Sequence, residues 1–304
     1  MIKPTNEELN RYKAYYKYDT PFASYARLLQ SKWRDGKGYQ SGDYGNYIEL
    51  EFAKRTKANY LTDNIKRCVS EAIIEARNNG GMVSEPRIWN NLLSSQPLCF
   101  NLFGEMSCDT ELATNFFKTL FPKIVVKVTK VRFEYSPKRG DKRYTGDHSA
   151  FDVFIEYLND KQELCFIGIE VKYAETLKEE TRQKGKDYFK DHNLEYSTLT
   201  NRSTVFKAGS IEHLKQVPIA QIWRDHLLSI ATKKDYKDGF FVFLFPSLNE
   251  ACQKGVDLYK SHLISTDEEI TGFYPRYLET FIEALEQVCN ATWVKELKER
   301  YLGV

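Results

Sequence analysis

Two strand-like runs separated by a short polar turn place the strongest constraint on the fold of this chain. In residues 151–157 and 165–173, every second side chain is hydrophobic, which is the period of a β-strand with a buried face. The turn-prone residues 159–162 lie between the runs and predict a hairpin. The expected buried faces are Phe151, Val153, Ile155 and Tyr157 on the first strand, and Cys165, Ile167, Ile169, Val171 and Tyr173 on the second.

The register of this hairpin brings charged residues together. For both apolar faces to reach the same core, even-numbered residues must pair with even-numbered ones. The simplest such register centres the turn on Lys161 and sets Asp152 opposite Glu170, with Cβ atoms roughly 4.5–5.5 Å apart. Lys172 follows on the same face as Glu170. Two carboxylates beside a lysine predict a site for a divalent cation.

Hydrophobic patterns elsewhere predict the elements that surround the hairpin. The wholly apolar run 239–246 is typical of a central strand that is buried on both faces. The expected helices are 11–35, 47–78 with an N-cap offered by 62–64, 110–121, 175–190, 218–230 and 278–297, with a strand at 123–136 and a loop at 197–203. The order around the hairpin is therefore helix, strand, strand with Asp152, strand with Glu170 and Lys172, helix and buried strand. This order predicts an α/β fold.

Composition narrows the class of protein. The chain has 304 residues, of which 42% are hydrophobic, enough for a sizeable core. Its six cysteines show neither zinc-ligand spacing nor a disulfide framework, so we expect reduced thiols and a cytoplasmic location. No window reaches the length of a membrane span. Because the net charge is only +2, any contact with nucleic acid must use local basic residues.

One such group of basic residues lies in the turn at 137–143. Lys138, Arg139, Lys142 and Arg143 precede the Asp152 strand and would suit a phosphate backbone. An ordinary charged, solvated turn explains them equally well. Arg224, on the helix over 218–230, is a further candidate for nucleic-acid binding.

The combination of Asp152, Glu170-Val171-Lys172 and a helix carrying Gln221 resembles the PD-(D/E)xK nuclease superfamily. The resemblance implies a restriction-endonuclease-like core, an αβββαβ mixed sheet flanked by helices. Segments 92–104 and 221–224 resemble a little-characterised bacterial branch of proposed restriction endonucleases.

The core resemblance covers about residues 105–246. From it we expect an N-terminal helical region over 1–104 that helps to recognise the substrate, a nuclease core over 105–250, and a C-terminal helical extension over 251–304 packed on the core.

The resemblance also implies roles for individual residues. Asp152, Glu170 and the backbone carbonyl of Val171 would hold Mg²⁺ or Mn²⁺, and Lys172 would orient or deprotonate the attacking water. Gln221 would touch the metal site or the neighbouring phosphate. Some relatives add a glutamate from the helix before the first strand, and here Glu111 is the candidate by position, with Glu105 behind it.

Three classes of function are consistent with these residues. The leading one is a metal-dependent endonuclease that hydrolyses DNA, of restriction or phage-defence type, with RNA not excluded as substrate. Cutting both strands of a duplex would favour a homodimer, since one metal site cuts one strand. The alternative is a nucleic-acid-binding module of the same fold that has lost cleavage. The third is a glycosidase with paired carboxylates, although the adjacent lysine would keep both acids ionised.

A purely structural interpretation is also open. Asp152, Glu170 and Lys172 could form an ion-pair cluster on an exposed sheet face, where each pair would contribute only about 0–1 kcal/mol to stability. His226 lies on the apolar stripe of its helix, and we expect it to be a packed core residue and not a general base.

Overall fold

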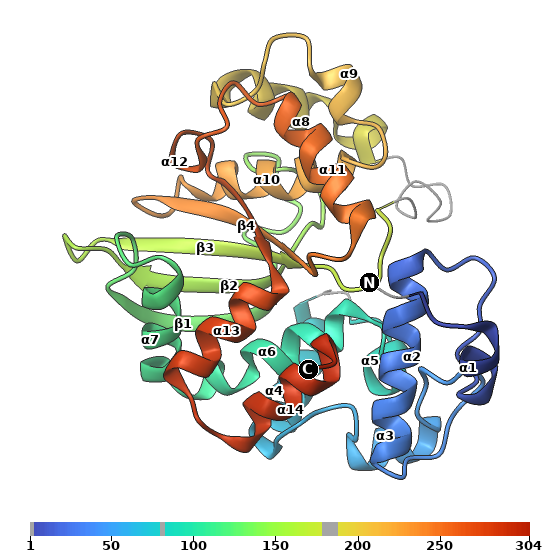
Figure 1. Ribbon diagram of the computed structural model, residues 1–304. Coiled ribbons are helices and arrows are strands. Elements are labelled where there is room, and N and C mark those ends of the chain that lie inside the picture. Colours follow the sequence, from blue (N-terminus) through green and yellow to red (C-terminus); the bar gives the residue numbers. More distant parts are fainter. Residues whose placement is uncertain (1–2, 80–82, 178–187) are drawn as a thin grey trace.

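A five-stranded mixed sheet in the order β1-β2-β3-β4-β5 forms the centre of the molecule (Figure 1). The computed structural model describes residues 3–79, 83–177 and 188–304. The strands are β1 (Lys127–Tyr135), β2 (Phe151–Leu158), β3 (Leu164–Val171), β4 (Gly239–Phe245) and β5 (Phe273–Tyr277). The first three strands pair in antiparallel fashion, and β3, β4 and β5 run parallel. The predicted α/β class, a mixed sheet flanked by helices, is confirmed.

Helices precede the sheet, connect its strands and follow it. Those before β1 are α1 (Asn6–Arg11), α2 (Pro21–Gly36), α3 (Leu50–Thr56), α4 (Asp63–Asn79), α5 (Arg87–Asn90), α6 (Ser95–Cys108) and α7 (Thr110–Leu120). Those after β3 are α8 (Tyr188–Ser203), α9 (Ile211–Leu214), α10 (Ala220–Thr232), α11 (Glu250–Ser261), α12 (Glu268–Thr271), α13 (Leu278–Val288) and α14 (Thr292–Leu302). The predicted N-cap of α4 is present, since Thr62 Oγ1 accepts a hydrogen bond from the Ile65 amide at 3.1 Å. Such a cap satisfies an amide that has no partner inside the helix.

The register of the β2–β3 hairpin is the predicted one. Phe154 pairs with Gly168 and Glu156 with Phe166, so even-numbered residues pair with even-numbered ones. The pair furthest from the turn is Val153 with Ile169. One residue further from the turn, the same register sets Asp152 level with Glu170.

Helices cover both faces of the sheet. Figure 1 shows α8, α10 and α11 on one side, and α6, α7, α13 and α14 on the other. Strand β4 is buried along its whole length, as predicted: its even-numbered side chains join the core under α6, α7 and α13, and its odd-numbered ones the core under α10. The first of these cores also contains residues from each of the three predicted regions, for example Phe22, Val153 and Phe281. The functional separation of those regions stays a prediction.

Phe151 departs from the predicted alternation. Its ring packs with Phe154 and Phe166 on the α10 side of the sheet, away from Val153. Gly168 makes room for it, because a Cβ at that position would lie 2.4 Å from the Phe151 ring. The second face of the hairpin is therefore also buried, which the sequence did not indicate.

Further predictions need correction. Residues 12–20 of the expected helix at 11–35 are not helical, and the expected helix at 47–78 is divided into α3 and α4 by residues 57–62. The expected loop at 197–203 is the second half of α8, and the expected helix at 278–297 is divided into α13 and α14 by a break at 289–291. Strand β5 was not predicted. Of the expected helix at 175–190, residues 178–187 lie outside the described part of the chain, and 175–177 are not helical. Across the described ranges, no helix combines the length and apolar composition that crossing a membrane requires.

Candidate active site

Three carboxylates lie at the same level on three neighbouring strands. Glu134 stands on β1 between the pairs Phe133–Val153 and Tyr135–Phe151, which places it level with Asp152 on β2. Asp152 is in turn level with Glu170 on β3 by the hairpin register. The sheet thus aligns Glu134, Asp152 and Glu170 in a row.

Glu170 is buried and held by two donors. Its Oε1 accepts a hydrogen bond from Lys172 Nζ at 2.7 Å and another from Gln221 Nε2 at 2.8 Å. The side chains of Glu170 and Lys172 are only 8% and 10% exposed, so this ion pair is shielded from water and not a surface pair. Gln221 reaches Glu170 from the first turn of α10, which packs on β4. The structure therefore places the side chains of Lys172 and Gln221 in contact with the Glu170 carboxylate.

Asp152 is held against the neighbouring strand by the main chain. Its Oδ2 accepts a hydrogen bond from the Val171 amide at 2.8 Å. The pKa of Asp152 is raised well above its usual value by burial, and further by the negative charges of Glu170 and Glu134, against which Lys172 acts. Negative charge at this point is therefore only partly compensated by the protein itself.

Glu134 is the functional candidate that the sequence did not reveal. Its Oε1 accepts a hydrogen bond from Gln96 Nε2 at 2.5 Å, at the start of α6. Burial raises the pKa of Glu134 to about 7, and the charge of Glu170 adds to the rise, although the Gln96 hydrogen bond opposes it. The backbone at Glu134 has a φ of 48°, a left-handed conformation that is uncommon for a side chain of this kind and often marks a functional position.

These groups open into one cleft of about 650 Å³. Its walls come from the start of α6, the segment before β2, the start of α8 and the first turn of α10. The polar residues that line it include Ser95, Gln96, Glu134, Asp147, His148, Asp152, Glu170, Lys172, Glu175, His192, Gln221 and Asp225, with arginines at Arg87, Arg139 and Arg224.

Asp147 fixes the wall formed by the segment before β2. It is 3% exposed and accepts hydrogen bonds from Thr145 Oγ1, from the amide and hydroxyl of Ser149, and from the Tyr196 hydroxyl on α8. Burial alone would raise the pKa of Asp147, but these donors outweigh it and the pKa is lowered. Asp147 therefore ties the segment to α8 through these hydrogen bonds.

The predicted basic residues divide into two groups. Arg139 and Arg224 line the cleft, and Arg224 lies 3.6 Å from Asp225. Lys138, Lys142 and Arg143 are exposed on the turn outside the cleft lining, where the largely exposed Arg143 forms an ion pair with Asp141 at 2.6 Å. Arg87, which the sequence did not suggest, joins the cleft from α5.

The glutamates suggested on the helix before β1 lie elsewhere. Glu111 is exposed in the first turn of α7 and is not among the described residues that line the cleft. The Glu105 carboxylate is engaged by the Thr62 hydroxyl and by Asn64 Nδ2. In this structure, the third acid beside Asp152 and Glu170 is Glu134.

The donor set suits a hard divalent cation. Hydrogen bonds within the described ranges engage Asp152 Oδ2 and Glu170 Oε1, which leaves the second oxygen of each carboxylate available. Within the same ranges, no three His, Cys, Asp or Glu side chains form a complete metal site by themselves. The predicted set needs only two carboxylates, because a backbone carbonyl and water supply the remaining oxygens that Mg²⁺ accepts.

Comparison with known proteins gives one match. A sequence model described as the PD-(D/E)XK nuclease superfamily matches residues 17–303. No curated protein and no solved structure matches the chain. The match spans nearly all of the chain, well beyond the central region that carries the acidic residues and the lysine. The chain belongs to the PD-(D/E)XK nuclease superfamily.

Proposed function

We propose that this protein is a metal-dependent deoxyribonuclease in which Asp152, Glu170 and the Val171 carbonyl hold Mg²⁺ or Mn²⁺. The observation that carries the proposal is the row of carboxylates that meets a buried lysine in one cleft. Membership of a nuclease superfamily supports a nucleic-acid substrate and a divalent metal.

The residues of the chain have distinct roles in this proposal. A bound cation would polarise the phosphoryl oxygens and make a water molecule nucleophilic near neutral pH. Lys172, held in place by Glu170 at 2.7 Å, orients that water and stabilises the negative charge that develops on the phosphate. Gln221 donates a hydrogen bond to the same oxygen of that carboxylate. Asp152 is fixed by the Val171 amide, so its ligand geometry is set before substrate binds.

Glu134 takes the role first assigned by position to Glu111. Its pKa is raised first by burial and then by the charge of Glu170, so ionised Glu134 would add negative charge beside Asp152 and Glu170 and increase the attraction of the site for a cation. The Gln96 hydrogen bond holds it there. A bound cation would in turn relieve the repulsion between the acids.

The arginines of the cleft support a phosphate backbone as substrate. Arg87, Arg139 and Arg224 line the same cleft as the carboxylates, and arginine is well suited to bind phosphate through paired hydrogen bonds. Lys138 and Lys142, on the adjacent exposed turn, could contact phosphates further along the strand. We propose in addition a role in restriction or phage defence in the cytoplasm, with two copies of the chain cutting the two strands of a duplex.

A cleavage assay tests the proposal. Plasmid DNA, linear duplex, single-stranded DNA and RNA are incubated with the protein in Mg²⁺, Mn²⁺ or a chelator. We expect cleavage of DNA only with metal, and a loss of roughly 100-fold or more in Lys172→Met, comparable to removing one group that stabilises transition-state charge. Lys161→Met is the matched control, because Lys161 is exposed in the hairpin turn away from the cleft.

The outcomes are distinct. Cleavage in the chelator, or undiminished cleavage by a folded Lys172→Met protein, would refute the proposed mechanism. Metal-dependent cleavage of RNA alone would refute DNA as the substrate but support the proposed metal site. DNA binding without cleavage on any substrate would favour the inactive binding module.

A further inference from the structure

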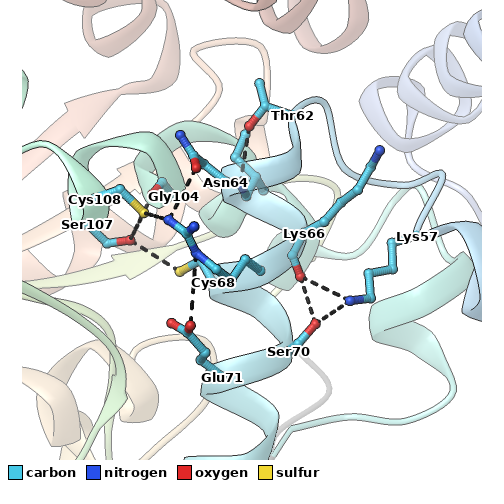
Figure 2. Close-up of polar contacts among 12 residues, drawn as sticks. Lys57, Thr62, Asn64, Lys66, Cys68, Ser70, Glu71, Gly104, Ser107 and Cys108 are labelled. Atoms are coloured by element: carbon cyan, nitrogen blue, oxygen red, sulfur yellow. Dashed lines mark hydrogen bonds and ion pairs between the residues drawn. The ribbon is translucent and has the colours of Figure 1, made fainter.

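Two cysteines that are far apart in the sequence both lie near Ser107, where α4 and α6 pack together (Figure 2). Cys68 lies on α4 and is buried, whereas Cys108 is the last residue of α6 and is exposed. Ser107 Oγ lies 3.3 Å from the Cys68 sulfur and 3.9 Å from the Cys108 sulfur. The separation of the two sulfurs therefore cannot exceed the sum of these distances.

The packing of the two helices explains this approach. A Cβ on Gly104 would lie 3.0 Å from the Ile65 side chain, so glycine permits the helices to come close at this point. Cys68 follows Ile65 by three residues and Cys108 follows Gly104 by four, which places each sulfur one turn further along the same helix face. A disulfide requires Cα atoms that are close together, and a glycine contact one turn away favours this.

The surroundings of the two sulfurs differ. Arg67 Nη2 donates a hydrogen bond to the Cys108 sulfur at 3.3 Å. Arg67 also donates to Asn64 Oδ1 at 3.2 Å and lies 4.0 Å from the Glu71 carboxylate. A positive charge at this distance stabilises the negative charge of a nucleophilic sulfur. Burial raises the pKa of the Cys68 thiol to about 12, so Cys68 remains a thiol at neutral pH.

We propose that Cys108 and Cys68 form a peroxide-reactive thiol pair, a modification site separate from the nuclease cleft and independent of the proposed function. The Cys108 sulfur attacks one oxygen of hydrogen peroxide, the O–O bond breaks, and sulfenic acid and water form. The Cys68 sulfur then displaces the hydroxyl group of the sulfenic acid, which leaves as a second water with the Cys68 proton. Two thiols are oxidised to one disulfide, and one peroxide is reduced to two waters.

Peptide mapping of the full chain tests this inference. The folded, reduced protein is treated with hydrogen peroxide, remaining thiols are alkylated, and the digest is analysed by mass spectrometry. We expect a cross-linked peptide that joins Cys68 to Cys108. Cys289, which is half-buried, serves as an internal comparison and should be oxidised more slowly than Cys108.

Three variants separate the roles of the residues. In Cys68→Ser, the Cys108 sulfenic acid should accumulate and react with dimedone, whereas Cys108→Ser should leave Cys68 reduced. Arg67→Gln should slow sulfenic acid formation about fivefold, the effect of removing one charge beside an exposed reacting atom. Each variant is first compared with the wild type by circular dichroism, and alkylation of the reduced wild type before denaturation confirms independently that Cys108 is accessible.

Several results would overturn the inference. These are the absence of the intramolecular cross-link in the oxidised wild type, equal oxidation rates for Cys289 and Cys108, and a disulfide between two copies of Cys108 that forms equally well in Cys68→Ser.

Discussion

Replacing Glu134 by Gln should stabilise the metal-free protein at alkaline pH. The folded protein raises the pKa of Glu134 from 4.5 to about 7, first through burial and then through the charge of Glu170. In the folded state the Glu134 carboxyl therefore keeps its proton up to about pH 7, whereas in the unfolded chain it releases the proton near pH 4.5. The resulting contribution to stability is fully present below pH 4.5 and is lost as the pH rises to 7.

The size of the effect follows from this interval. Each pH unit between the two pKa values corresponds to about 1.4 kcal/mol, so ionised Glu134 lowers the free energy of unfolding by at most about 3.5 kcal/mol. In Glu134→Gln the charge is absent, but the side-chain oxygen that accepts the Gln96 hydrogen bond remains. Above neutral pH the variant should therefore exceed the wild type in stability by up to that amount, and near pH 4 the two should be equal.

Urea unfolding followed by tryptophan fluorescence measures the difference. The measurement is made in chelator at acidic and at alkaline pH, and is then repeated with Mg²⁺. Mg²⁺ should narrow the gap in free energy of unfolding between the variant and the wild type, because a bound cation compensates the third carboxylate. Glu111→Gln is the control, since Glu111 is exposed and its charge at the helix N-terminus contributes only about 0.3–1 kcal/mol in the opposite direction. A Glu134→Gln protein no more stable than the wild type at alkaline pH without metal would refute this reasoning, as would a gap that Mg²⁺ leaves unchanged.

Three further predictions concern the cleft, the sheet and the core. Gln221→Ala should reduce the cleavage rate roughly 10- to 100-fold, because one hydrogen bond to a charged group contributes about 1.5–3 kcal/mol; a wild-type rate would show that Gln221 does not support Glu170. Gly168→Ala should destabilise the protein by about 1–3 kcal/mol, because its Cβ would meet the Phe151 ring, and thermal unfolding at the wild-type temperature would contradict this. Burial lowers the pKa of His226 to about 3 from 6.5, so stability should be full above pH 6.5 and fall below it by up to about 1.4 kcal/mol per pH unit. Urea unfolding of His226→Gln should show a shallower fall, and equal slopes would exclude His226 as the cause.

The hairpin could be predicted because its sequence carries several concordant signals. Alternation of apolar residues, a turn-prone segment and the requirement for one shared core leave a single simple register, and Asp152 and Glu170 follow from it. Gln221 lies at Glu170 because α10 packs on β4; its place near the site was expected only from the family resemblance. His226 is 1% exposed and bonded to Tyr259 and Thr271, as its place on an apolar stripe indicated.

Glu134 could not be found by the same pattern. Among the mixed polar and apolar residues of 127–135, it resembles any solvated strand residue. The signal that identifies it is the β1–β2 register, which depends on the turn at 136–150 and on the left-handed backbone at Glu134. Because Phe133 pairs with Val153 and Tyr135 with Phe151, Glu134 lies beside Asp152.

Other differences have equally local causes. Strand β5 contains Pro275 and has only five residues, too short for alternation to be recognised, and it forms by pairing with β4. The polar residues at 197–203 are helical because one face of α8 is anchored, with Thr200 Oγ1 accepting from Trp223 Nε1 at 3.1 Å. The thiol pair of Cys68 and Cys108 could not be predicted because the two residues lie on different helices, α4 and α6, whose packing against each other the sequence does not reveal.

We propose that Asp152, Glu170 and the Val171 carbonyl hold a divalent cation. Anomalous diffraction from crystals soaked in Mn²⁺ tests this most directly, because it locates the metal without relying on activity. We predict a peak within coordination distance of Asp152, Glu170 and the Val171 carbonyl oxygen, and the loss of that peak in Asp152→Asn crystals. A Mn²⁺ peak elsewhere, with none between these residues, would contradict it.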